Sequence, residues 1–99
     1  MKKVGNFTYN EAELAKLCEG NDIKYLALFG SYLHGTNKPS SDIDFLVEFK
    51  NRKSLFELVD IKDSLESKLG KKIDLLSPKY LSPYFKNEVE REAKVIYEG

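Results

Sequence analysis

Three short apolar segments alternate with capped helices along this chain, and this order restricts the folds that it can adopt. The segments are residues 23–29 (IKYLALF), 43–49 (IDFLVEF) and 72–76 (KIDLL). Mostly apolar runs of this length, bounded by polar residues or glycine, are typical of strands in a sheet that helices cover. We therefore expect a small α/β domain, of the α+β kind, in which helices flank one mixed β-sheet.

Two helices are marked by capping boxes, in which a hydroxyl residue is followed three positions later by glutamate. The first box, residues 8–11 (TYNE), predicts a helix over residues 9–19. The second, residues 54–57 (SLFE), predicts a helix that ends at Gly70, a natural residue just past a helix end. The apolar positions of this second helix follow the period of 3.6 residues that a face packed on a sheet requires. They are Leu55, Leu58, Val59, Ile61, Leu65 and Leu69.

A last helix begins at Ser82-Pro83, because proline suits the first helical position. Its predicted apolar face consists of Leu81, Tyr84, Phe85 and Val89. The aromatic group of Tyr80, Tyr84 and Phe85 fits either the core or a surface for a partner. Residues 94–97 fit either an extension of this helix or an edge strand, and the pattern does not decide between them.

Length and composition exclude several classes of protein. The 99 residues predict one domain, residues 1–99, without room for a second substrate-binding domain. Sixteen basic residues balance sixteen acidic ones, which argues against a generic binder of nucleic acid or anionic membranes. The single cysteine, Cys18, excludes a disulfide framework and is expected in the core. No apolar run approaches the ~20 residues that span a bilayer and no leader is present, so we expect a soluble, cytoplasmic protein.

Gly30-Ser31, directly after the first predicted strand, is a candidate anion site. Glycine lets the backbone approach a ligand closely, and the amide groups at the start of a helical turn point outward together with the Ser31 hydroxyl. Gly35 then lets the chain turn away without a side chain over the phosphates. Taken alone, this short glycine motif more often marks an ordinary turn.

Three aspartates are candidates for metal chemistry. Asp42 and Asp44 flank Ile43 at the start of a strand, so they project from one face and repel each other unless a cation such as Mg²⁺ lies between them. Asp74 is a lone acid in an apolar strand. Solvation of the first two and pairing of Asp74 with Lys72 are the structural alternatives. If the two strands are neighbours, the three carboxylates can hold two divalent ions.

Residues 30–47, GSYLHGTNKPSSDIDFLV, resemble the nucleotidyltransferases of the DNA polymerase β superfamily and, more narrowly, the minimal nucleotidyltransferase (MNT) proteins. The motif is Gly-Ser, a glycine four residues after that serine, and Ser-Asp-Ile-Asp followed by apolar residues. Apolar strands flank it, and a third aspartate, Asp74, follows a helix as in the family. The resemblance implies a polymerase-β-like nucleotidyltransferase palm over nearly the whole chain.

The resemblance also implies roles for these residues. The nucleotide, most often ATP in this family, would contact Gly30, Ser31, Gly35 and Ser41. Mg²⁺, as two ions, would be bound by Asp42, Asp44 and Asp74. Asp74 would also help to deprotonate the acceptor hydroxyl, which attacks the α-phosphorus of the nucleotide with loss of pyrophosphate. Catalysis would come mainly from positioning and from neutralisation of charge on the transferring group.

Two positions carry open alternatives. Many relatives have arginine where this chain has His34, and an arginine there would be a permanent cation near phosphate. His34 therefore implies either weaker nucleotide binding or a side chain that faces solvent. Residues 50–53 (KNRK) form either a solvated turn or a contact with a nucleotide-bearing partner.

The acceptor must come from outside this small domain, since related enzymes that act on antibiotics, RNA or DNA use a second domain to bind it. MNT proteins are commonly paired with an all-helical HEPN-domain protein that resembles a toxin ribonuclease. The resemblance implies that the MNT protein acts as antitoxin, by transferring AMP to a tyrosine of the toxin and by complex formation.

We therefore expect Mg²⁺-dependent transfer of AMP from ATP to a hydroxyl of a HEPN-type partner protein. One alternative is a non-catalytic module that binds nucleotide or neutralises its partner by complex formation. Another is nucleotidyl transfer to a small molecule or RNA whose acceptor site lies on a partner chain. A homo-oligomer or hetero-oligomer is compatible with each reading.

Overall fold

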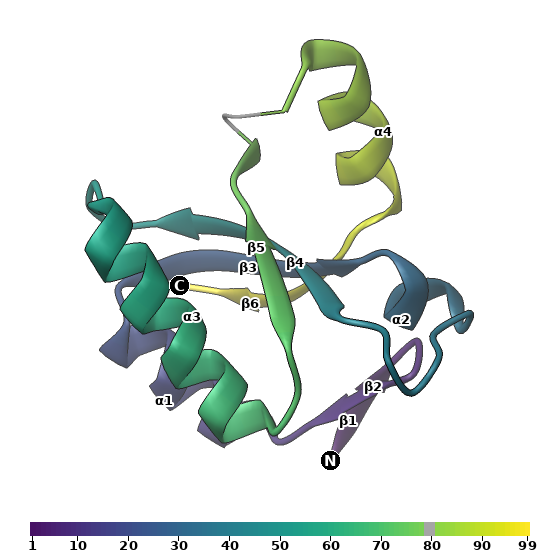
Figure 1. Ribbon diagram of the computed structural model, residues 1–99, viewed down its shortest axis with the longest axis horizontal. Helices are drawn as coiled ribbons and strands as arrows, with labels where there is room; N and C mark the ends of the chain where they lie inside the picture. The colour runs from purple at the N-terminus through teal and green to yellow at the C-terminus, as the bar shows by residue number, and fades with distance from the viewer. Residues whose placement is uncertain (79–80) are drawn as a thin grey trace.

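The structure is a computed structural model that describes residues 1–78 and 81–99 (Figure 1). Its elements follow the alternation of strands and helices that the sequence predicts. In chain order they are β1 (Lys2–Val4), β2 (Phe7–Tyr9), α1 (Glu11–Gly20), β3 (Ile23–Phe29), α2 (Ser31–His34), β4 (Ile43–Phe49), α3 (Leu55–Leu69), β5 (Ile73–Leu76), α4 (Pro83–Glu92) and β6 (Lys94–Glu98).

The main sheet is mixed, as predicted, with strand order β5-β4-β3-β6. β4 pairs with β3 in antiparallel and with β5 in parallel orientation. The parallel pair requires a crossover, which α3 supplies between the two strands. β6 pairs with β3 as an antiparallel edge strand, which decides the alternative left open for residues 94–97.

The two faces of the sheet are covered unequally. One face carries the main core, in which Leu26, Leu28 and Phe45 are fully buried beneath residues of α1 and α3 such as Cys18 and Leu65. Figure 1 shows α1 and α3 together on one side of the sheet, with α4 set apart from them. On the opposite face, Ala27 and Leu46 pack against Val89 of α4 in a much smaller cluster. The second face therefore leaves room for polar groups and ligands.

The start of the first helix differs from the prediction. Thr8 lies in β2, and Asn10 caps α1 by accepting a hydrogen bond of 3.0 Å from the Glu13 amide. Phe7 and Tyr9, which flank Thr8, are buried, and the Phe7 ring meets Phe45 edge-on with centroids 5.5 Å apart. Burial of two aromatic side chains against the sheet thus decides in favour of a strand over the capping box that the residue types allowed.

The other helix boundaries are confirmed. Ser54 and Glu57 make both hydrogen bonds of a capping box, and Gly70 ends α3 in the left-handed conformation. Ser82 caps α4, with proline in its first turn. Cys18 is fully buried, as predicted, and burial raises the pKa of its thiol to about 12.

The predicted apolar faces of α3 and α4 are only partly correct. Ile61 and Leu65 are buried, whereas Leu55 and Val59 are 79% and 58% exposed. The buried side chains of α3 thus begin at Ile61, and the apolar residues before it on the helix do not enter the core. On α4, Val89 is buried but Tyr84 and Phe85 are exposed; Tyr80, the third member of that aromatic group, lies outside the described residues. In residues 1–78 and 81–99, no helix is both long and apolar enough to cross a membrane.

Candidate active site

Gly30 joins β3 to the short helix α2 and adopts a conformation that other residues avoid, with φ 79° and ψ −154°. A Cβ atom at this position would overlap the carboxylate of Asp44. Glycine is therefore required for two reasons, the backbone dihedral and the close approach of the neighbouring strand. Together they place the backbone of the turn directly against Asp44.

The turn after Gly30 is held in place from both sides. Tyr32 is buried in the core, and its carbonyl accepts a hydrogen bond of 2.8 Å from the Asn6 amide in the β1–β2 turn. Gly35 ends α2 in the left-handed conformation, and its N–H donates to the carbonyl of Ser31. Ser31 itself remains partly exposed. The predicted anion site thus has a fixed backbone and a side chain that solvent can reach.

Asp44 and Asp74 are direct neighbours in the parallel β4–β5 pair. On its other side, Asp44 is in register with Phe29, the last residue of β3 before Gly30. Strand alternation directs Ile43 and Phe45 into the main core, so Asp44 lies on the opposite, less covered face. The structure therefore brings together Gly30, Asp44 and Asp74, which the sequence predicted as one site.

The electrostatics of the pair favour a cation. The pKa of Asp44 is raised, first by burial and then by repulsion from Asp74 and Asp42, with a hydrogen bond to Asp74 as a further cause. Each cause disfavours negative charge on Asp44, and a positive ion placed between the carboxylates would oppose the repulsion. Carboxylate oxygens are also the ligands that Mg²⁺ prefers.

Asp42 lies one residue before β4 and is partly exposed. Its charge acts on Asp44, but in the part of the chain that the structure describes no three His, Cys, Asp or Glu side chains gather closely enough to hold a metal ion. The donor set fits a hard cation by its chemistry, and the closed three-carboxylate cluster stays a prediction.

Ser41 shapes the approach to Asp42. Its hydroxyl oxygen accepts a hydrogen bond of 2.8 Å from the Lys38 amide, and its own amide donates to the Lys38 carbonyl over 2.9 Å. The same loop is tied to the β1–β2 turn by a 2.9 Å hydrogen bond from Asn6 to Asn37. These three hydrogen bonds order the loop that leads into β4, and contact of Ser41 with a nucleotide stays a prediction.

His34 is exposed, in agreement with the solvent-facing alternative. Its Nε2 atom lies 3.2 Å from Oε2 of Glu92 at the end of α4. The pair links α2, the helical turn of the site, to the end of α4. Sequence reasoning missed Glu92 because 58 residues separate the two side chains.

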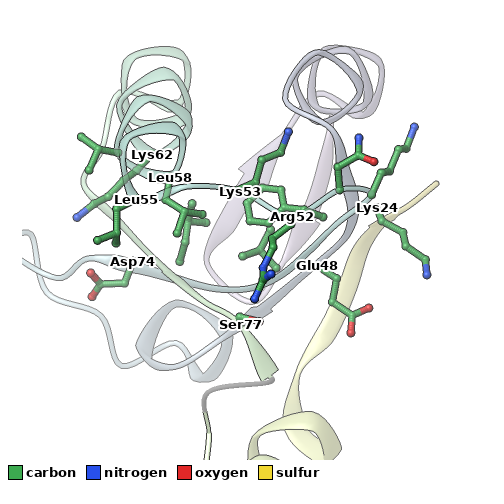
Figure 2. Close-up of a pocket in the computed structure, with 15 residues that line it drawn as sticks. Lys24, Glu48, Arg52, Lys53, Leu55, Leu58, Lys62, Asp74 and Ser77 are labelled. Atoms are coloured by element: carbon green, nitrogen blue, oxygen red, sulfur yellow. The ribbon is translucent and has the colours of Figure 1, made fainter.

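A groove of about 770 Å³ begins at Asp74 and runs between β4, the loop of residues 50–53 and the first turns of α3 (Figure 2). We refer to it as the β4–α3 groove. Of the loop residues, Lys53 has a nearly buried side chain. Its Nζ atom lies 2.8 Å from Oδ2 of Asp22 and 3.8 Å from Oε2 of Glu57. Lys50 and Arg52 are exposed, as expected for a solvated turn. No sequence pattern indicates the groove, because its lining residues come from distant elements that meet only in the folded chain.

The comparisons with known proteins agree with this geometry. The family profile described as Polymerase beta, Nucleotidyltransferase matches residues 12–99. MJ0435 of Methanocaldococcus jannaschii, whose assigned activity is that of a protein adenylyltransferase, is 44% identical over 71 residues, or 72% of this chain and 76% of the relative. Protein adenylyltransferase MntA of Thermococcus cleftensis is 34% identical over 87% of this chain and 85% of its own length.

A solved structure shares the fold. A crystal structure of a toxin–antitoxin complex with AMP-PNP contains a chain with a TM-score of 0.74 and 27% identity, over 92% of this chain and 75% of that one. The profile covers the four strands of the main sheet, the glycine turn and the three aspartates. This chain therefore belongs to the polymerase β nucleotidyltransferase family.

Proposed function

We propose that this protein transfers AMP from ATP to a hydroxyl group of a HEPN-type toxin and thereby acts as its antitoxin. The observation that carries the proposal is the register of Asp44 and Asp74 beside Gly30, which joins a carboxylate pair to a phosphate-binding turn. The assigned activity of the two curated relatives is protein adenylyltransfer, and the solved neighbour is a toxin–antitoxin complex with an ATP analogue.

The residues of the site divide the reaction between them. The backbone amides after Gly30 and the Ser31 hydroxyl bind the triphosphate. Asp42 and Asp44 are the residues that would hold Mg²⁺, with Asp74 beside them; the ion supplies neutralisation of the charge that develops on the phosphates. Asp74, the more exposed member of the pair, accepts the proton of the acceptor hydroxyl.

The bond changes follow from these roles. The acceptor oxygen forms a bond to the α-phosphorus, and the bond from that phosphorus to the bridging oxygen of the β-phosphate breaks. Pyrophosphate leaves with the electron pair, and the hydroxyl proton passes to Asp74. Positioning by the rigid turn and the paired strands supplies much of the acceleration, because the reacting groups then meet without loss of further entropy.

A separate partner protein is the acceptor that the fold favours. The described elements form the four-stranded sheet, the β1–β2 hairpin and their helices, and an acceptor site completed by another molecule fits this arrangement. The resemblance to MNT proteins identifies that partner as a HEPN-type toxin.

The second candidate function is neutralisation by complex formation alone. It is favoured by one observation, the exposed aromatic side chains of Tyr84 and Phe85 on α4, which offer a contact surface that needs no chemistry. The two functions are separable, because the contact surface and the carboxylates lie on different elements.

The test uses purified HEPN-domain protein from the same organism, Mg²⁺ and ATP labelled at the α-phosphate. Wild-type protein is compared with the Asp42→Asn/Asp44→Asn double variant, and with Asp63→Asn as a control for removal of an exposed aspartate elsewhere. We expect label on the partner with wild type and Asp63→Asn, and none with the double variant. Unlabelled partner that is nevertheless neutralised by all three proteins would instead support complex formation alone.

A further inference from the structure

The β4–α3 groove extends the site away from the carboxylate pair toward a surface that the transfer reaction itself does not use. Asp74 lies at one end, and Lys24 and Glu48 lie at the other (Figure 2). Leu55 and Lys62 descend from α3 on the side of Asp74, and Arg52 lies between the two ends. A molecule bound along the groove would therefore reach the reacting carboxylate with one of its ends.

The wall formed by α3 is apolar and exposed. Leu55, Leu58 and Val59 line it, and Leu75 of β5 also lines the groove. Leu55 is 79% exposed and Val59 58%, whereas Ile61 and Leu65 of the same helix are buried. Exposed aliphatic side chains that line a concave surface are typical of a binding site, because their burial on binding is favourable.

The charged side chains of the lining are mostly cationic. Lys24, Lys50, Arg52, Lys53 and Lys62 line the groove, against the two acids Glu48 and Asp74. Lys53 is neutralised by Asp22 and Glu57, whereas the ion pairs found among residues 1–78 and 81–99 include neither Arg52 nor Lys62. The excess of positive charge is therefore available to a ligand with carboxylates.

A strand edge is also free in the groove. β5 is in register with β4 only over residues 43–46, so in the described chain residues 47–49 of β4 pair with β3 alone. Val47, Glu48 and Phe49 all line the groove. An extended peptide segment can add to such an edge through backbone hydrogen bonds, while its side chains contact the walls.

These features together favour one class of ligand. We propose that the β4–α3 groove binds an extended segment of the acceptor protein that carries aliphatic side chains and carboxylates, and that this segment delivers the acceptor hydroxyl to Asp74. The inference rests on the proposed function for the identity of the acceptor. The aliphatic side chains pack on Leu55 and Val59, and the carboxylates pair with Arg52 and Lys62.

Nucleic acid fits the groove less well. Single-stranded nucleic acid binds where exposed aromatic rings stack on bases beside a cationic track. The one aromatic side chain among the lining residues, Phe49, packs against the main core, and the remaining apolar lining is aliphatic. Aliphatic walls with scattered cations match a peptide better.

The chain offers matched controls for both parts of the surface. Phe56, next to Leu55, is 86% exposed but does not line the groove. Lys68 stands on the same helix as Lys62 and lies outside the groove. The test variants are therefore Leu55→Ser/Val59→Ser and Arg52→Glu/Lys62→Glu, and the control variants are Phe56→Ser and Lys68→Glu. All the substituted side chains except Lys62 are exposed, so the fold should tolerate them.

Affinity for the HEPN-domain protein is measured by surface plasmon resonance, and AMP transfer to it is measured in parallel. We expect Leu55→Ser/Val59→Ser to weaken binding by about tenfold or more. Arg52→Glu/Lys62→Glu should lower the association rate by about tenfold at low salt and reduce its salt dependence. Phe56→Ser and Lys68→Glu should remain within about twofold of wild type.

The two readouts separate this inference from the proposed function. Transfer to the partner with unchanged binding by the groove variants would overturn the groove and leave the function standing. Weakened binding by the groove variants without transfer by wild type would support the groove and overturn the function. No binding by wild type would overturn both. Two other results would overturn the proposed occupant. In the first, the groove variants keep partner binding but lose binding to a labelled single-stranded RNA. In the second, they keep partner binding but lose a dimer that wild type shows in light scattering.

Discussion

Asp44 and Asp74 are direct partners on two neighbouring parallel strands, although 30 positions separate them in the sequence. Asp44 also lies against the backbone of Gly30. This relationship follows from the crossover through α3, which returns the chain beside β4. Two acids of like charge in this register repel each other unless a cation is bound between them.

Substitution of Gly30 by alanine should abolish transfer. The new Cβ would collide with the Asp44 carboxylate, and alanine does not adopt the observed dihedral without strain. We expect a loss of about 1–3 kcal/mol of unfolding free energy, measured with urea. Gly70→Ala is the matched control, since Gly70 also has a positive φ but an added Cβ there would meet no neighbouring atom. It should lose stability and keep activity; transfer at the wild-type rate by Gly30→Ala would contradict the close approach.

Mg²⁺ should stabilise the wild-type fold through the carboxylates. At a concentration tenfold above its dissociation constant, a ligand that binds only the folded state adds about 1.4 kcal/mol, which a rise in Tm detects. The Asp42→Asn/Asp44→Asn variant should show little of this rise, whereas Asp63→Asn should show it in full. An equal rise in Tm for the double variant would place the ion elsewhere.

The raised pKa of Asp44 predicts a pH dependence in the presence of EDTA. A carboxyl group whose pKa is higher in the folded than in the unfolded state binds more protons when folded. The free energy of unfolding therefore falls as pH rises from about 3.8, the ordinary pKa, through the raised pKa of the folded state. Asp44→Asn removes the ionisation and should be at least as stable as wild type at pH 7. Urea titrations at several pH values measure this, and a strong loss of stability in Asp44→Asn at pH 7 would show that the charge is instead favourable.

Asn10, not Thr8, should be the residue that caps the first helix. Asn10→Ala removes the side chain that accepts from the Glu13 amide and should cost about 1 kcal/mol of unfolding free energy. Thr8 is exposed in β2 and makes no cap, so Thr8→Ala should cost clearly less. Equal losses in urea unfolding would indicate that the capping box of the sequence forms after all.

The strands of the main sheet and the long helix were predictable because local patterns and tertiary packing agree there. β3 and β4 occupy the predicted residues, and α3 has the predicted cap and end. The β1–β2 hairpin was not predicted, since Thr8 fits both a helix cap and a strand, and only burial of Phe7 and Tyr9 decides. Local propensity alone does not contain that long-range contact.

The candidate site was predictable in part for a similar reason. Gly30, Asp44 and Asp74 are recognisable by residue type, and the prediction that they lie together is confirmed by the strand register. Glu92, which meets His34, and the groove beside α3 depend on how distant elements pack, so no spacing in the sequence indicates them.

The most direct test of the account is the single-turnover rate of AMP transfer by an Asp74→Asn variant, with the partner and ATP both saturating. Under these conditions binding is complete and the rate reports the chemical step. Loss of a positioned base should lower this rate by about 10²-fold or more, while Asp63→Asn transfers at the wild-type rate. An unchanged rate in Asp74→Asn would contradict the assignment of Asp74, and with it the central role of the Asp44–Asp74 pair.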